Sequence, residues 1–421
     1  MKAKVLFVSS YDESCGNAYF TKALVDSMKN MCDAECLQIR LELTQSRIKR
    51  VRKMADEHIS GLCEKLKTAD YVNLQIEPVL YGLKEGDIVR RIVKLMTANA
   101  NTTITMHNTR ILPGRMNVNV RGIIKDILLF RPIKAARKVM FLNAIYGNMR
   151  VNRRIIKAAK KHNIYVIVHT ERARRQILAV FGYDKVIVHP LKFCSSDSDT
   201  KRSGIETLST IKKALKIDNS ARIIGMFGYI SHYKGHHDAI RALGILGNEY
   251  YCFFFGRQHP QTIYQYGEMD EYINKLLNLV KEEKLEERVV FLGEWPEKEF
   301  VGLMGAVDIC WLPYYEVGQD GSGIAAQVFE ESSRVVCSAS SAFDELLAME
   351  TRSNVWRCDI GNYAELAAKT RLALGSSSQS RTGSVKSYTV SSQVKAYCEA
   401  WGLNVDVKQD TVSRQWAHHH Q

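Results

Sequence analysis

The chain has 421 residues, of which 46% are hydrophobic and 25% are charged, the balance of an ordinary globular protein with room for two domains. No run of about eighteen uncharged apolar residues occurs, which argues against a membrane-spanning helix. The apolar run at the start, residues 5–8, is too short for a signal-peptide core, so we expect a cytoplasmic protein whose ten irregularly spaced cysteines are reduced.

Short apolar runs alternate with amphipathic segments through the first half of the chain. Between the first two runs, the apolar residues of segment 17–30 have the spacing of a helix. The runs lack the polar alternation of half-exposed strands, which is typical of parallel strands covered by helices on both faces. They span residues 4–10, 70–77, 102–108, 164–170 and 185–191. The order predicts a doubly wound α/β domain.

The pattern pauses at a polar segment rich in Ser and Thr and then restarts. The second series of predicted strands spans residues 221–229, 250–256, 288–294, 307–314 and 334–340, with helical spacing at 235–247, 269–284 and 298–306. A second Ser-rich stretch precedes a last helical segment. We therefore predict an N-terminal domain over 1–193, a linker over 194–210, a C-terminal domain over 211–385, and a terminal helix and tail over 386–421.

Positive charge is concentrated in one part of the chain. The formal net charge is +14, and residues 101–175 hold seventeen Lys and Arg against two acids. Apolar and basic residues interleave over residues 121–147, as in a segment that lies among lipid headgroups. We expect an anionic membrane surface as the partner of this segment, through Arg131, Lys134, Arg137 and Lys138. Nucleic acid is a less favoured partner, because no base-reading element is recognisable.

Two glycine-containing loops at predicted strand ends indicate an anion site. In the first, Lys234 precedes a helix, where its charge adds to the helix dipole. In the second, a helix begins near Ser322, and the backbone N–H groups of Ser322 and Gly323 would point at an anion. Two such elements at the edge of one sheet suit a diphosphate.

The second half of the chain resembles the retaining glycosyltransferases of the GT-B fold, the group 1 or family 4 type. The resemblance follows FGYISHYKG (227–235), FFFGRQHP (253–260), Asp308 with Pro313 and Tyr314, and SASSAFDEL (338–346) in the family's order. It implies two Rossmann-like domains facing a cleft. The first half matches more loosely, at Gly16 and Asn17 and at His107.

The resemblance also implies roles for particular residues. His107, Lys234 and Gln319 would act near the transferred sugar. The donor would be bound by Gly16, Asn17, Tyr229, Lys234, Arg257, Ser322, Gly323 and Gln327. The family transfers sugars without a metal ion, so neither a metal nor a cofactor is expected beyond the nucleotide diphosphate-sugar.

Two glutamines depart from the family pattern. The family has two Glu separated by seven residues, and the gapless match places Gln319 and Gln327 there. An amide still bonds ribose hydroxyls, but it lacks the charge that would stabilise a cationic transition state. Asp320 or Glu330 would have to supply that charge. Tyr229 likewise stands where the family has Arg.

We expect a metal-independent glycosyltransferase (a hexosyltransferase) that acts on a glycan or lipid-linked acceptor in surface polysaccharide assembly, with retention, at the inner membrane face. Two alternatives remain: a non-catalytic nucleotide-sugar-binding partner protein, and a glycosyltransferase acting on DNA.

Overall fold

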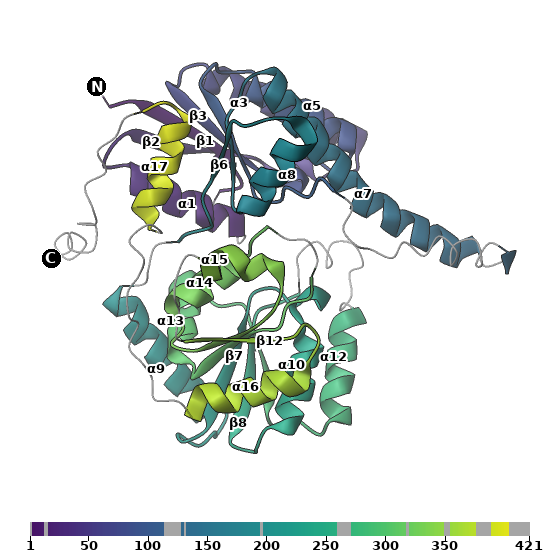
Figure 1. Cartoon of the computed structure of the whole chain (residues 1–421), viewed down its shortest axis with the longest axis vertical. Coiled ribbons are helices and arrows are strands. Elements are labelled where there is room, and N and C mark those ends of the chain that lie inside the picture. Colours follow the sequence, from purple (N-terminus) through teal and green to yellow (C-terminus); the bar gives the residue numbers. More distant parts are fainter. Residues whose placement is uncertain are drawn as a thin grey trace. The chain divides into compact units, whose positions relative to one another are not determined.

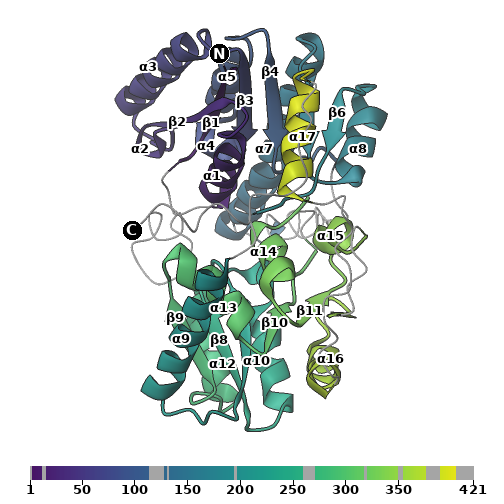
Figure 2. The same ribbon diagram turned by 90° about the vertical axis from the view of Figure 1, so that its left-hand side faces the viewer.

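The computed structural model describes residues 2–11, 16–112, 128–129, 132–193, 197–258, 271–316, 320–348, 354–375 and 389–403, and gives only the backbone for 132–146. The described chain divides into two compact units (Figures 1 and 2). The first comprises Met1–Leu191, Gly318–Gly321 and Thr389–Gln409. The second comprises Lys192–Val317, Ser322–Tyr388 and Asp410–Gln421.

The first unit is built on a six-stranded parallel sheet of order β2-β1-β3-β4-β5-β6. Its strands are β1 (Lys4–Ser9), β2 (Asp33–Gln38), β3 (Tyr71–Ile76), β4 (Thr102–Met106), β5 (Val166–Val168) and β6 (Val186–Val188). Its longer helices are α1 (Gly16–Met28), α3 (Lys49–Leu66), α5 (Glu85–Met96), α7 (Pro132–Lys161), α8 (Glu171–Phe181) and α17 (Val390–Ala400). Two single-turn helices, α2 (Leu41–Thr44) and α4 (Pro78–Tyr81), follow β2 and β3.

The helices cover both faces of this sheet, which explains why its central strands are buried on both sides. Helices α1 and α17 lie on one face, and α3, α5, α7 and α8 lie on the other (Figure 1). All five residues of β4 are buried, as are five of the six in β1 and in β3. Strand β2 escaped the sequence analysis because it is an edge strand with only one buried residue, Ala34.

The second unit has a six-stranded parallel sheet of order β12-β11-β10-β7-β8-β9. Its strands are β7 (Arg222–Phe227), β8 (Tyr250–Phe255), β9 (Val289–Gly293), β10 (Ile309–Leu312), β11 (Val335–Ser338) and β12 (Val355–Cys358). Its helices are α9 (Ser198–Ala214), η1 (His232–Lys234), α10 (His236–Ile245), α12 (Glu271–Glu282), α13 (Glu297–Ala306), α14 (Gly323–Glu331), η2 (Ser341–Phe343), α15 (Asp344–Ala348) and α16 (Tyr363–Gly375).

Two segments lie elsewhere than the sequence suggested. Most of the predicted linker, 194–210, is the helix α9, which packs on α13 in the second unit. The contact is close, because a Cβ on Gly204 would lie 2.1 Å from the Gly302 carbonyl carbon. The terminal helix α17 returns to the first unit, where Tyr397 and Trp401 lie about 6 Å, centre to centre, from the Phe7 ring.

Buried polar residues cross the centre of the first sheet. The Asn73 amide donates to Thr103 Oγ1 at 2.9 Å, and the Gln75 amide donates to Asn73 Oδ1 at 2.7 Å. Tyr397 of α17 joins this network, since its hydroxyl accepts from Thr105 Oγ1 at 2.9 Å. The network satisfies every member and leads to the carboxyl ends of β3 and β4.

Candidate functional site

The strand order of the second sheet places its ligand site. Chain direction across the sheet reverses between β7 and β10, the topological switch point at which open α/β sheets bind ligands beyond the carboxyl ends of the strands. The loop after β7 carries Lys234, and the loop after β10 leads into α14. The two loops that the sequence suggested for phosphate binding therefore lie on either side of this switch point.

Lys234 is unusual because it is a buried cation. Its side chain is buried, and its Nζ donates to the Phe227 carbonyl at 3.3 Å. No carboxylate pairs with it in the described part of the chain. Burial lowers the pKa of its ammonium to about 7. A buried cation without a counter-charge is costly in water-free surroundings, and a bound anion would remove that cost.

Gly228 and α14 fix the position of this ammonium. Gly228 has φ +87°, and a Cβ there would lie 2.5 Å from Lys234 Nζ and 2.9 Å from Ile324 Cγ1. The lysine nitrogen thus lies close to the first turn of α14. A larger residue at position 228 would both strain the backbone and displace the lysine.

The N-terminus of α14 offers donors to the same point. Ser322 is the N-cap, and its Oγ accepts from the Ala325 N–H at 3.2 Å. The Ser322 hydroxyl thus caps the helix as an acceptor, and its own proton can still be donated to a ligand. The N–H groups of Gly323 and Ile324 have no intrahelical acceptor, so they remain available to an anion.

Of the other donor-site predictions, Tyr229 and Gln327 lie half-buried in this unit, with Gln327 one turn after Gly323 on α14. Arg257 differs from expectation, since its Nε lies 2.9 Å from Glu294 Oε2. Glu294 offsets the charge that we expected Arg257 to lend to the donor phosphates.

The carboxylates that could replace the family's Glu are both engaged. Asp320 is buried and accepts from Thr109, through its N–H and its hydroxyl, with Arg172 at 3.4 Å. Glu330 pairs with Lys192. Gln319 lies outside the described residues. Each acid is thus paired with a cation that offsets part of its charge.

In the first unit, His107 follows β4 and lies in a histidine pair. Its Nε2 lies 2.8 Å from Gln75 Oε1, and its Nδ1 lies 3.0 Å from His169 Nε2. His169 Nδ1 in turn donates to the His189 carbonyl at 2.9 Å. Burial lowers the pKa of both imidazoles, that of His107 well below its usual value. Both ring nitrogens of His107 are thus engaged, so a sugar hydroxyl could bond one of them only in place of Gln75 or His169.

The remaining first-unit predictions begin helix α1. Gly16 is exposed with no atom within 4 Å of where a Cβ would stand, and Asn17 is half-buried. Sequence reasoning missed His169 and Gln75, although a Gln within an otherwise apolar predicted strand is a usable signal. It also missed Glu77, directly after β3, whose pKa burial raises to about 7.

Of the predicted membrane patch, Arg131 lies outside the described residues. Lys134, Arg137 and Lys138 lie in α7, and their side chains are not described. None of the described helices is long and apolar enough to span a membrane.

One Asp-x-Asp pair, a pattern able to hold a divalent cation, is used structurally. Asp197 caps α9 by accepting from the Thr200 N–H at 2.7 Å, and Asp199 Oδ1 lies 3.4 Å from an Arg202 nitrogen. Among the described residues, no group of three His, Cys, Asp or Glu side chains is arranged to hold a metal ion.

Comparison with known proteins finds a family model that is similar to part of the chain. Residues 209–382 match the family model described as "Glycosyl transferases group 1". The match spans less than half of the chain and coincides with the second unit. No curated protein sequence matches the chain.

Solved structures match nearly the whole chain. HepE from Anabaena, in complex with UDP-glucose, has a TM-score of 0.61 at 15% identity, covering 95% of this chain and 99% of that one. A UDP-forming α,α-trehalose-phosphate synthase from Burkholderia xenovorans has a TM-score of 0.64 at 9% identity, covering 95% and 99%. WaaG, a glycosyltransferase involved in lipopolysaccharide biosynthesis, has a TM-score of 0.55 at 13% identity, covering 94% of each chain.

At these identities the structural likeness establishes the fold, two Rossmann-like domains as in GT-B glycosyltransferases, and confirms the predicted fold class. Most of the second unit matches the family model of group 1 glycosyltransferases. Together these findings support a glycosyltransferase.

Proposed function

We propose that the protein transfers a sugar from a nucleotide diphosphate-sugar to a glycan or glycolipid acceptor. The observation that carries the proposal is the buried, unpaired ammonium of Lys234 beside the free N–H groups of α14. The positive charge and the N–H donors suit a diphosphate, and structures of the same fold have been solved with UDP and UDP-glucose.

In this proposal the donor diphosphate is the leaving group. As the bond to the anomeric carbon breaks, negative charge develops on the β-phosphate. Lys234 and the Gly323 and Ile324 N–H groups are already in place to stabilise that charge, without reorganisation. Gln327, one turn further along α14, would bond the ribose hydroxyls through its amide. We propose transfer with retention and without a metal ion.

The acceptor is proposed to be a growing surface glycan on a lipid carrier, at the inner face of the membrane. Two observations support this choice: the basic and apolar segment at 121–147, and the likeness to WaaG. The protein would then act in the cytoplasm as a peripheral membrane enzyme.

The donor proposal is tested by calorimetric titration of UDP, GDP and ADP into the whole chain. At least one should bind wild type, and Lys234→Met should lose about 1.5 kcal/mol or more of binding free energy, as for a lost charge-assisted hydrogen bond. Lys201→Met, an exposed lysine in the same unit, is the matched control. Equal affinity of wild type and Lys234→Met would contradict the site.

A second candidate, a non-catalytic nucleotide-sugar-binding partner, is favoured by Gln327 and by the engagement of Asp320 and Glu330. Turnover of radiolabelled donor separates the two functions. For an enzyme, Gln319→Ala should lower the single-turnover rate more than donor affinity. Gln327→Ala should lower affinity, and Gln327→Glu should preserve it. A wild type and a Gln319→Glu/Gln327→Glu variant that both bind donor but do not react would favour the partner protein.

A further inference from the structure

A pocket of about 470 Å³ opens in the first unit, and neither His107 nor His169 is among its lining residues. It forms where the chain leaves β2 and β3. It is lined by Thr44, Ser46, Arg47, Arg52, Leu83, Lys84 and Asp87. No part of the proposed sugar transfer uses it.

The pocket has an excess of positive charge. Three of its lining side chains are cations and one is an anion. Asp87 forms ion pairs with Arg52 at 2.6 Å and with Arg90 at 3.2 Å. Arg47 and Lys84 are exposed, and within the described ranges no carboxylate pairs with either.

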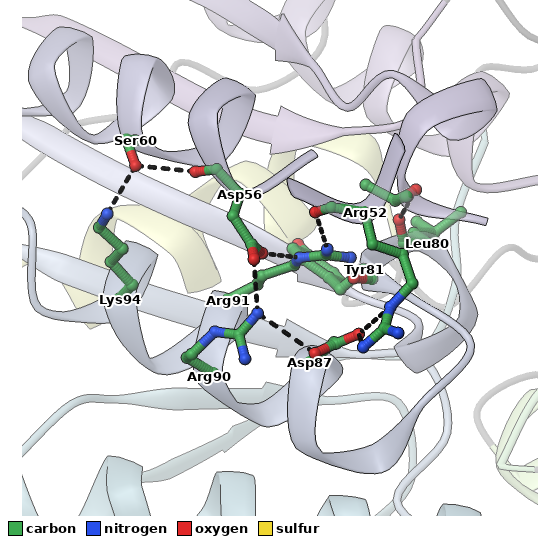
Figure 3. Close-up of polar contacts among 10 residues, drawn as sticks. Arg52, Asp56, Ser60, Leu80, Tyr81, Asp87, Arg90, Arg91 and Lys94 are labelled. Atoms are coloured by element: carbon green, nitrogen blue, oxygen red, sulfur yellow. Dashed lines mark hydrogen bonds and ion pairs between the residues drawn. The ribbon is translucent and has the colours of Figure 1, made fainter. Parts of the chain in front are cut away.

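A network of ion pairs holds the inner wall of the pocket in place (Figure 3). Arg91 is buried; its Nε donates to Asp56 Oδ1 at 2.6 Å, and its other nitrogens donate to the carbonyls of Tyr81 and Arg52, each at 2.9 Å. Arg90 links Asp56 to Asp87. Arg52, which lines the pocket, is therefore fixed by its backbone and its side chain at once.

Further cations follow along α3. Its first two turns carry Lys49, Arg50 and Lys53, all exposed, and its first turn has no acidic residue. The N-cap, Ile48, provides no side-chain acceptor. Cations at an uncapped helix N-terminus oppose the helix dipole, so this arrangement lowers the stability of α3 unless an anion binds nearby.

Large apolar side chains stand among these charges. Leu83 lines the pocket and is 46% exposed, while Ile48 and Met54 are 65% and 47% exposed. Soluble phosphate-bearing ligands do not need such residues at the rim of their site. A bilayer surface does, because its headgroups take the cations and its acyl boundary takes the apolar tips.

We propose that this α2–α3 patch, defined as the pocket together with Ile48, Lys49, Arg50, Lys53 and Met54, docks on a membrane containing anionic phospholipid. A headgroup phosphate occupies the pocket between Arg47 and Lys84, with the Ser46 and Thr44 region at its base. The patch is separate in sequence from the basic segment at 121–147, and its docking does not depend on the donor site.

The test is co-sedimentation of the full chain with vesicles of phosphatidylcholine, with and without phosphatidylserine. Wild type should bind the anionic vesicles, and an Arg47→Glu/Lys84→Glu variant should bind about tenfold less or weaker still. The matched control, Lys201→Glu/Lys395→Glu, makes the same change of charge at exposed lysines of α9 and α17 and should lose less than about threefold by general repulsion.

A second variant isolates the apolar contribution. Leu83→Ser leaves the charge unchanged, and it should lower vesicle binding several-fold at high salt, where the electrostatic part is screened. Hydrogen exchange then locates the surface: anionic vesicles should protect peptides covering residues 41–54 and 83–92.

Three results would overturn the proposal: undiminished vesicle binding by Arg47→Glu/Lys84→Glu, protection confined to 121–147, or equal protection of 41–54 by inorganic phosphate alone, which would assign the pocket to a soluble ligand. UDP affinity should be the same in wild type and in these variants. Failure of docking is thus distinguishable from failure of the proposed transferase function.

Discussion

At the scale of single residues, Lys234 shows how a ligand site costs stability. Its ammonium is buried, no carboxylate among the described residues pairs with it, and burial lowers its pKa to about 7. The unfolded chain would hold the same lysine at its ordinary value of 10.5. Between these two values the unfolded state binds more protons than the folded state, so the free energy of unfolding rises with pH.

Lys234→Met should therefore stabilise the unliganded protein while abolishing its binding of nucleoside diphosphate. We expect a gain of about 2 kcal/mol in the free energy of unfolding near pH 6, since the variant buries an apolar chain of similar length. The gain should shrink as the pH approaches 10, where wild type no longer pays for the charge. Urea unfolding at a series of pH values measures this; a loss of stability at pH 6 would contradict it.

The affinity for nucleoside diphosphate should change with pH in the opposite direction to stability. A bound diphosphate favours the protonated lysine, so above pH 7 the complex takes up a proton from solution and affinity falls as the pH rises. Titration calorimetry at pH 8 in two buffers of different ionisation enthalpy should reveal an uptake that is absent at pH 6. A pH-independent affinity over this range would mean that Lys234 is already charged before the ligand arrives.

At the scale of elements, the close approach of α9 and α13 depends on two glycines. A Cβ on Gly204 would lie 2.1 Å from the backbone of Gly302, so α9 and α13 would have to move apart to admit it. Gly204→Ala should cost about 2 kcal/mol or more of stability. The control is Gly61→Ala on the exposed face of α3, where no atom lies within 4 Å and stability should rise by about 0.8 kcal/mol. Urea denaturation of both variants decides the matter.

The two arginines of α5 that pair with Asp56 of α3 should contribute unequally to stability. Arg91 is buried and satisfies two backbone carbonyls, so Arg91→Met should lose about 3 kcal/mol, because it leaves those carbonyls and Asp56 short of donors. Arg90 lies more than half exposed beside it, and Arg90→Met should lose less than about 1 kcal/mol. Thermal unfolding of the pair would contradict this account if the two losses were equal.

Some elements of the fold could be predicted from the sequence, and others could not. The central strands were predictable because they are mostly apolar, and the Lys234 loop because FGYISHYKG resembles a family motif. The edge strand β2 carries too few apolar residues to be seen. The pairing of His107 with His169 was beyond reach, since it joins residues sixty-two positions apart through the ends of neighbouring strands. Likewise, nothing local to Arg257 predicts that Glu294 will neutralise it.

At the scale of the whole molecule, the first unit is completed by α17, which the sequence places at the opposite end of the chain. Tyr397 contributes a hydroxyl to the polar network of the sheet, and the Trp401 ring stands 5.7 Å from that of Tyr71. The Trp401 indole also donates to the Val72 carbonyl at 3.2 Å. Removal of α17 would expose the Phe7 and Tyr71 rings and take the Tyr397 hydroxyl out of the polar network.

A chain ending at residue 388 should therefore lose stability selectively in the first unit. Calorimetry should show one transition shifted down by about 5 °C or more, while UDP still raises the temperature of the other. A chain ending at residue 403 keeps every described contact of α17 and serves as the control. Equal shifts of both transitions would show that α17 stabilises the molecule in some more general way.

The return of α17 also sets an order of events during synthesis. The ribosome makes the strands of the first sheet early, but the helix that covers Phe7 emerges only after almost the entire second unit has been translated. Domains ordinarily fold as they emerge, N-terminal first. Here the earlier half must wait, with an apolar face open to water, so chaperones that hold nascent chains have more to do for this protein than for one whose halves are each contiguous.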